Sequence, residues 1–484
     1  MRLARARASV ADYLVMETSD ALTSLRGFRT AVYACFGQRA DALFDLTDAL
    51  LATGPIQSPA YLSLHPVHRR GWGSLYAALA QGHLDSERLR TLLARYPLVD
   101  GQPIYAVDTS VWARCDAETS PERGYYYHPS RHSAGQPIVA GWSYQWINQL
   151  SFARDSWTAP LDVQRVHPTQ DVNTVAAEQI KALLPRLPAD HPVPLFVFDA
   201  GYDPIQLALD LDDAPVAVLV RLRKDRCFYA DPDPAMATST GRPRKHGHKF
   251  VCKHSATWLP PTAEHRTQDE QYGEVRVRAW ANLHAIPQNH ATKGTRGPKP
   301  LIRGVLVLVE VSRLPRRCHK RQVLWLWWHG PGTPDLDVLW RAYVRRFDQE
   351  HTYRFCKQTL NWTVPRVRHP EQADRWTWLV VAAYTHLRLA RSCVADQRLP
   401  WERRLKPSSL TPSRVRRGFS SLLSVLGTPA NPPKPAGRSP GRPKGGADPD
   451  RPPSIQLSRR QPKPLLRSPC SAPALQSRPG HAPL

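Results

Sequence analysis

At Pro103 the pattern of apolar residues changes from a helical period to that of β-strands. Before this point, residues 20–53 and 72–97 carry apolar side chains at three- and four-residue spacing, which predicts amphipathic helices. After it, strand-like runs flank a helical pattern at 171–187, and this mixture predicts an α/β core. Strand-like runs then dominate from about 215 to 330, and helical patterns return at 335–362 and 372–394.

The net charge and the spacing of the cysteines limit the classes of protein to which this chain can belong. The chain has 66 Lys and Arg against 41 Asp and Glu, a net charge of +25. A body this basic attracts phosphate backbones, although a solvated basic surface without a specific partner is the alternative. The eight cysteines form no C-x-x-C pair, which indicates reduced thiols. No apolar run approaches the roughly 18–20 residues of a membrane span, so we expect a cytoplasmic protein without a membrane partner.

These changes of pattern divide the chain into five predicted segments. Residues 1–100 form a helical N-terminal domain, which either binds DNA or caps the core. The α/β core spans 101–220 and 333–428, and a β-rich insertion at 221–332 interrupts it. From residue 429 the chain is rich in Pro, Gly, Ser and Arg, a composition that buries too little surface to order itself. We therefore expect a disordered tail over 429–484.

Two aspartates lie in or directly after strand-like runs. The run IYAVDTSVW places Asp108 inside a predicted strand, and PLFVFDAGYD places Asp199 at the carboxyl end of another. A carboxylate within an apolar strand is costly unless it is paired or binds a metal. Functional groups often lie at the carboxyl ends of strands in α/β sheets, although an aspartate that starts a turn is the alternative for Asp199.

A third acid, Glu350, lies in the basic stretch YVRRFDQEHTYRFCK at 343–357. On one straight helix, Tyr343, Arg346, Glu350 and Lys357 fall within about 60° of one another. A surface helix with scattered ion pairs would explain this pattern equally well. Taken with the two aspartates, however, Glu350 completes an all-oxygen set of the kind that hard divalent cations prefer. Two such ions roughly 4 Å apart would support phosphodiester chemistry.

The spacing Y-x(2)-R-x(3)-E-x(6)-K resembles the signature of one branch of the DDE transposases of bacterial insertion sequences. The resemblance extends from about residue 30 to 390 and includes the order Asp, Asp, Glu with a β-rich insertion before the glutamate. It implies a ribonuclease H-like mixed sheet with flanking helices. It also implies that Asp108, Asp199 and Glu350 are the catalytic residues and hold two Mg²⁺ ions, with Mn²⁺ as a substitute.

The resemblance further implies roles for the basic and aromatic residues of the signature. Arg346 and Lys357 match residues that hold DNA phosphates at the cleaved end, and Tyr343 matches one that contacts phosphate near the cut. An ion pair with a nearby acid is the alternative for Lys357. A guanidinium can grip a phosphate through two hydrogen bonds, whereas an ammonium acts as a point charge.

Other residues could contact DNA outside the signature. In related transposases an aromatic side chain of the insertion stacks on a flipped base, and Trp325, Trp327 or Trp328 could do so. Packing in a strand core is the alternative for all three. The segments GRPRK at 241–245 and GRPK at 441–444 resemble minor-groove peptides, but non-specific phosphate contact explains them as well. The candidate DNA-binding residues of the first segment are Arg242, Arg244 and Lys245.

The resemblance therefore predicts a bacterial transposase that cuts DNA at terminal inverted repeats and joins the 3′-hydroxyl ends to target DNA. Double-stranded DNA is the expected partner, a homodimer is expected in the complex of paired ends, and the bound protein would be associated with the nucleoid. Two alternatives stay open. One is an inactivated or domesticated relative that only binds DNA, and the other is a ribonuclease H-like nuclease without strand transfer.

Overall fold

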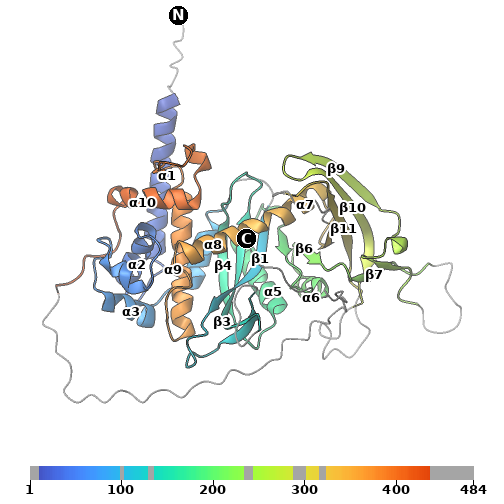
Figure 1. Ribbon diagram of the computed structural model, residues 1–484, viewed down its shortest axis with the longest axis horizontal. Helices are drawn as coiled ribbons and strands as arrows, with labels where there is room; N and C mark the ends of the chain where they lie inside the picture. Colours follow the sequence, from blue (N-terminus) through green and yellow to red (C-terminus); the bar gives the residue numbers. More distant parts are fainter. Residues whose placement is uncertain are drawn as a thin grey trace, which may run out of the picture.

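The computed structural model of the protein describes residues 10–98, 103–128, 136–233, 244–286, 301–314 and 323–435. Figure 1 shows a helical part on one side, a mixed sheet in the middle and a strand-rich part on the other side. This architecture confirms the predicted α/β class, a large mixed sheet with flanking helices. The segment GRPK at 441–444 and most of the predicted tail lie outside the described residues.

The chain begins with a set of helices, as the apolar spacing predicts. Asp85 caps the last of them by accepting a hydrogen bond from the backbone N–H of Arg88. Arg29 and Asp48 form a buried ion pair at 2.8 Å between two of these helices. The helical segments are α1 (Val10–Tyr33), α2 (Ala40–Ala52), η1 (Pro59–Leu64), α3 (Trp72–Gln81) and α4 (Ser86–Ala94).

The core sheet combines antiparallel and parallel pairs. Strand β1 pairs antiparallel with β3 on one side and parallel with β5 on the other, and β5 pairs parallel with β6. The strands are β1 (Ile104–Ala113), β2 (Gly124–Tyr127), β3 (Ile138–Leu150), β4 (Ala159–Val166), β5 (Leu195–Phe198) and β6 (Ala217–Leu222). The connecting helices are α5 (Val172–Leu183), η2 (Leu184–Arg186) and α6 (Pro204–Asp210).

The predicted β-rich insertion extends this same sheet. Strand β12 pairs antiparallel with β6, so the sheet continues in the order β2-β3-β1-β5-β6-β12-β11-β10-β7-β8, with β4 beside β3 and β9 beside β10. The elements are β7 (Cys227–Tyr229), β8 (Lys249–Val251), η4 (Ser255–Thr257), β9 (Ala263–Asp269), β10 (Gly273–His284), β11 (Arg303–Val311) and β12 (Val323–His329).

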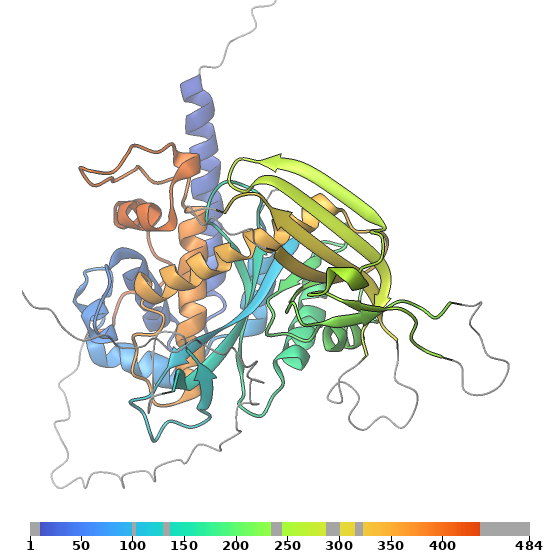
Figure 2. The same cartoon turned by 45° about the vertical axis from the view of Figure 1, so that its right-hand side comes forward.

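The C-terminal helices join the two sides of the molecule. Helices α7 and α8 run across the sheet, and α9 stands among the N-terminal helices (Figures 1 and 2). Both α9 and α10 pack against α2. The elements are α7 (Leu336–Arg345), α8 (Phe347–Gln358), α9 (Pro370–Leu389), η5 (Pro407–Ser409) and α10 (Pro412–Leu426).

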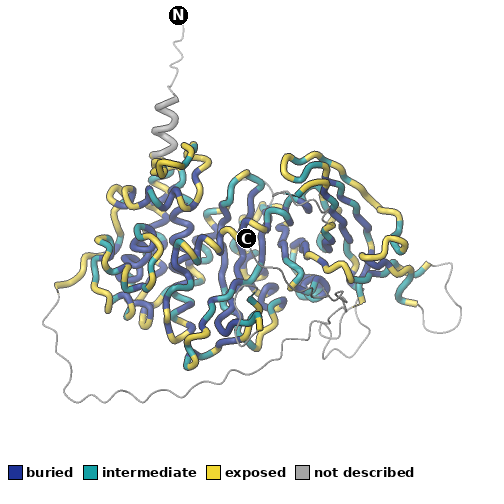
Figure 3. Tube along the Cα trace, viewed as in Figure 1, coloured by how far each residue is buried: buried dark blue, intermediate teal, exposed yellow. Residues whose placement is uncertain are grey.

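The hydrophobic core covers both faces of the sheet. One cluster joins the N-terminal helices, α9 and one face of the strands, and it includes Val107, Phe198 and Val220. A second cluster lies on the opposite face, where residues of α7 pack on Ala106 and Val197. The buried segments in Figure 3 accordingly run through the helical part as well as the sheet. Whether residues 1–100 act as a separate domain stays a prediction.

Two predictions about composition can be compared with the described residues. Cys35, Cys115, Cys227, Cys252, Cys356 and Cys393 are free thiols in the structure. Within the described ranges, no helix has both the length and the apolar character needed to cross a membrane.

His386 on α9 makes the stability of the helical part depend on pH. Its ring is fully buried edge-on against Phe28, at 4.8 Å between centroids, and its Nδ1 lies 2.7 Å from the carbonyl oxygen of Ala382. Burial, assisted by the charge of Arg29, lowers the pKa of His386 from 6.5 to about 3. Between these values the unfolded chain binds a proton here and the folded chain does not, so stability falls as the pH decreases below 6.5.

We expect this residue to contribute a loss of about 1.4 kcal/mol of unfolding free energy per pH unit between pH 6 and pH 4. Urea unfolding of the wild type and of His386→Gln at several pH values measures this contribution, because a glutamine does not titrate. The exposed His254 supplies the control, and His254→Gln should keep the wild-type slope. Equal slopes for wild type and His386→Gln would contradict the prediction.

Candidate active site

The register of the sheet brings Asp108 and Asp199 side by side. Val107 of β1 pairs with Phe198 of β5 in parallel register. Asp108 directly follows Val107 in the sequence, and Asp199 directly follows Phe198. Adjacent strands lie about 4.8 Å apart. Asp108 and Asp199 therefore lie on neighbouring segments of chain at the same level of the sheet, one residue beyond this pair.

Helix α8 carries Glu350 to the same place. The hydroxyl of Tyr353 donates a hydrogen bond of 3.0 Å to the backbone oxygen of Asp108. Gln349 donates to the hydroxyl of Tyr353 at 2.6 Å and to the backbone oxygen of Trp146, the strand partner of Asp108, at 3.4 Å. Glu350 is exposed and lies between these two anchors in the sequence. Both anchors therefore hold the glutamate helix over β1.

The electrostatics of Asp108 show that the three acids share one environment. Burial, assisted by the negative charges of Asp199 and Glu350, raises the pKa of Asp108 to about 7, while the positive charge of Arg346 opposes the rise. Arg346 forms an ion pair with Asp108 at 2.8 Å, and both side chains are largely buried. The charges of Asp199 and Glu350 therefore act on Asp108, and the assignment of these three acids as the catalytic residues stays a prediction.

The loop after β5 holds the second aspartate in place. The backbone N–H of Gly201 donates a hydrogen bond of 2.8 Å to Oδ1 of Asp199. A Cβ atom at position 201 would lie 2.9 Å from that oxygen, so any side chain there would displace the carboxylate. Glycine thus permits the close approach of backbone and carboxylate.

The acids fit a hard divalent cation by their chemistry, because carboxylate oxygens are the ligands that Mg²⁺ prefers. Their geometry in this structure, however, differs from that of a metal site. Among the described residues, no group of three or more His, Cys, Asp and Glu side chains is placed so that it could hold a metal ion. The guanidinium of Arg346 instead supplies the positive charge beside Asp108. A metal at this position would have to replace that ion pair.

The structure changes the interpretation of the signature residues. Helix α7 ends at Arg345 and α8 begins at Phe347, so the four residues do not lie on one straight helix. Tyr343 is buried in the second core cluster, and Arg346 is buried against Asp108. In this conformation neither side chain is presented to a phosphate, because packing and ion pairing hold both inside. Lys357 is half-buried with its ammonium 5.5 Å from the ring of Trp362.

The three tryptophans of β12 pack inside the protein. Trp327 stacks on Phe228 with ring centroids 4.9 Å apart, and Trp325 lies against Trp258 at 5.2 Å. Trp328 points into the cluster beneath α7 on the other face, as the alternation along a strand predicts. All three are at most 6% exposed. Core packing, the alternative interpretation, therefore describes them here, and base stacking would require the insertion to open.

The residues of the GRPRK segment are only partly described. Arg242 lies outside the described residues. Arg244 is exposed and Lys245 half-buried, and both precede β8 on the insertion. Their position is compatible with contact to a polyanion, and their role in DNA binding stays a prediction.

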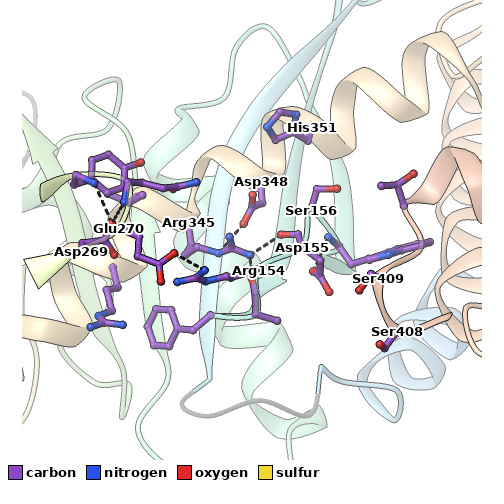
Figure 4. A pocket seen from close by; sticks show the side chains of 18 of the residues that line it. Arg154, Asp155, Ser156, Asp269, Glu270, Arg345, Asp348, His351, Ser408 and Ser409 are labelled. Atoms are coloured by element: carbon purple, nitrogen blue, oxygen red, sulfur yellow. Dashed lines mark hydrogen bonds and ion pairs between the residues drawn. The ribbon is translucent and has the colours of Figure 1, made fainter. Parts of the chain in front are cut away.

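A cavity of about 750 Å³ borders α7 and α8, and none of the three acids lines it. It is enclosed by the tip of the β9–β10 hairpin, one side of α7 and α8, and residues 408–411 (Figure 4). Three arginines of its wall are paired with acids of the same wall: Arg345 with Asp348, Arg391 with Asp155 and Arg154 with Glu270. Charges paired in this way are typical of a contact between parts of a fold, so we assign no ligand to this cavity.

The sequence interpretation missed two residues that position the site, Gln349 and Tyr353. Tyr353 follows Glu350 by three residues, so helical spacing alone places it on the same side of α8 as the glutamate. Its partner, the backbone of Asp108, is 245 residues away and could not be inferred from spacing.

Comparisons with known proteins identify the family of the chain. The family model described as "DDE superfamily endonuclease" matches residues 31–285, a range that includes Asp108 and Asp199 and ends before Glu350. No match was found among curated proteins. A solved structure of a piggyBac transposase synaptic complex with hairpin DNA is similar with a TM-score of 0.39 at 10% identity, covering 80% of this chain and 71% of that chain. Since the family model spans more than half of the sequence, the protein belongs to the DDE superfamily of endonucleases.

Proposed function

We propose that the protein is a transposase that cleaves DNA at terminal inverted repeats and joins the freed 3′-hydroxyl ends to target DNA. The observation that carries this proposal is the convergence of three acids from distant parts of the chain. Asp108 and Asp199 emerge together from parallel strands, and the charge of Glu350 acts on Asp108. The family supports endonuclease chemistry, and strand transfer is our extension of it.

Asp108, Asp199 and Glu350 are the residues that would hold divalent cations, two Mg²⁺ ions or Mn²⁺ as a substitute. When bound, such ions activate a water or hydroxyl nucleophile and stabilise the leaving oxygen of a phosphodiester. The chain itself contributes the positions of the carboxylates: the parallel register aligns the aspartates, and Tyr353 anchors the glutamate helix to β1. The buried carboxylate of Asp108 has a positive partner in Arg346, which favours its ionised form.

The release of Arg346 would connect metal binding to DNA binding. Its guanidinium can pair with Asp108 or with a phosphate, but the same donors cannot serve both at once. We propose that Arg346, once released from Asp108, would hold a backbone phosphate, and that Asp108 would then be available to hold a metal together with Asp199 and Glu350. Tyr343 and Lys357 remain proposed phosphate contacts that would need the same rearrangement of the α7–α8 junction.

The remaining parts of the proposal concern partners and location. The net charge of +25 favours DNA as the polyanion. A homodimer would pair two DNA ends, and the protein would act in the bacterial cytoplasm, bound to the nucleoid.

A donor-plasmid assay tests the proposal. The DNA that flanks the gene is placed on both sides of a selectable marker, and the purified protein is incubated with it, a target plasmid and Mg²⁺. We expect marker joined to target DNA. Cut donor without joined product would favour a nuclease that lacks strand transfer, and binding without cutting would favour an inactivated relative. The presence of all three acids argues against the inactivated relative.

A further inference from the structure

A second, smaller cavity lies at the edge where the core sheet meets the insertion. It has a volume of about 300 Å³, and three basic residues line it, Arg221, Arg223 and Lys224. The rest of its wall comes from Ala200, from Leu222 and from residues 323–325 at the start of β12. Ala200 directly follows Asp199, so this cavity borders one of the candidate catalytic residues.

The parallel register places Arg221 in line with the two aspartates. Val107 pairs with Phe198, and Phe198 pairs with Val220. The residues that follow these three are Asp108, Asp199 and Arg221, which therefore emerge from neighbouring strands at the same level of the sheet. With about 4.8 Å between strands, the backbone of Arg221 lies one strand spacing beyond that of Asp199.

All three basic residues of this cavity are exposed. Every residue of β6 is buried except Arg221, although this strand lies in the middle of the sheet. Arg223 and Lys224 continue the chain beyond the strand and are exposed as well. In an extended chain, residues 221 and 223 point to the same side about 6.6 Å apart. Arg221 and Arg223 therefore form a short row that leads away from Asp199, and Lys224 continues it in the following turn.

Among the described residues, the positive charges of this row are not paired with acids. None of its three members forms an ion pair with another residue in the described part of the chain, in contrast to the paired arginines of the cavity in Figure 4. Arg226 and Lys253 extend the positive charge, since the backbone N–H of Cys252 binds the backbone oxygen of Arg226 and brings the two loops together. Asp225 is the one acid within residues 221–226.

We propose that Arg221, Arg223 and Lys224 form a binding site for the phosphodiester backbone of the DNA strand next to the scissile bond. The inference rests on the proposed function, because it takes DNA as the ligand, and it adds a contact surface on the insertion. Unpaired arginines bind phosphate through paired hydrogen bonds, and lysine adds a mobile charge. A strand held along this row leads directly to Asp199.

The test measures how DNA affinity depends on salt. The probe is a fluorescent DNA duplex of mixed sequence, titrated by anisotropy over a range of NaCl concentrations without divalent metal. The variant R221A/R223A/K224A removes three cations, and the matched control R403A/R404A/K406A removes three exposed cations from the segment between α9 and α10. Thermal unfolding is measured for both, and because the replaced side chains are exposed we expect little change.

For the wild type, the logarithm of the binding constant should fall linearly with the logarithm of salt concentration. We expect the slope for the row variant to be shallower by about 2 to 3, because each phosphate contact contributes about 0.9. The control variant should keep a slope within about 1 of the wild type. The charge-preserving variant R221K/R223K should recover most of the lost slope, which separates the effect of charge from a change of fold.

Three outcomes would overturn the inference: an unchanged slope for the row variant, an equal decrease for the control, or no recovery with lysines. The second would mean that only the net charge of the protein matters. A wild-type protein that does not bind the duplex at any salt concentration would instead refute the proposed function. The two failures are therefore distinguishable.

Discussion

Replacement of Glu350 by glutamine should strongly slow DNA cleavage while leaving DNA binding and thermal stability close to those of the wild type. Glutamine has the same shape but lacks the negative charge that a divalent cation requires. The loss of one carboxylate from such a site should reduce the cleavage rate on the order of 10³-fold, the equivalent of about 4 kcal/mol of transition-state stabilisation. Stability should change little, because the side chain is exposed on α8.

The measurement combines single-turnover cleavage in Mg²⁺ with duplex binding in EDTA. Glu178→Gln is the matched control, since Glu178 is an exposed glutamate in the middle of helix α5 and outside the site. It should cleave DNA at the wild-type rate. A Glu350→Gln protein that cleaves normally would show that Glu350 is not a catalytic residue. One that loses binding or unfolds at lower temperature would show a structural role instead.

Replacement of Arg346 by alanine should lower the unfolding free energy of the metal-free protein by about 3 kcal/mol, because it leaves the buried carboxylate of Asp108 without its partner. The loss should increase with pH. An unpaired Asp108 avoids its charge by keeping a proton, and this becomes harder as the pH rises. Mg²⁺ should stabilise the variant more than the wild type, because no guanidinium then competes for the carboxylate.

Urea unfolding at pH 5 and pH 8, in EDTA and in Mg²⁺, measures both effects. The control is Arg341→Ala, which removes a half-exposed ion pair with Asp337 one helical turn away and should cost less than about 1 kcal/mol. Asp108→Asn should remove most of the effect of Arg346→Ala in a double-mutant cycle, since the pair then no longer exists. Additive losses, or equal Mg²⁺ effects on wild type and variant, would contradict competition between Arg346 and the metal.

Much of the fold could be predicted because its signals are local. The runs that became β1, β5 and β6 are apolar almost throughout, as strands covered on both faces must be. The helical periods of α5 and α9 are equally clear, and the acid at the end of β5 was identified by its place after a buried strand. The prediction of a mixed α/β sheet with flanking helices was therefore confirmed.

Predictions that assumed an exposed side chain, available to contact DNA, were less successful, because exposure depends on residues that are distant in the sequence. The stretch 343–357 suggested one continuous helical face, but a junction at Arg346 separates α7 from α8. The tryptophans of β12 could equally well have stacked on a base or packed a core. In the structure Trp327 packs on Phe228 and Trp325 packs on Trp258, both from other parts of the insertion. Burial of this aromatic surface is more favourable than its exposure to solvent.

The sequence by itself determined which segments form strands and helices, and which acids end up in or after buried strands, because both depend on the order of apolar and polar residues along a few turns. Tertiary structure alone decided the partners. Asp108 and Arg346 are 238 residues apart and meet only because α8 lies on β1, and Arg221 stands beside Asp199 only through strand register. Pairing of this kind follows from long-range packing and hydrogen bonding, which no local pattern of residues specifies.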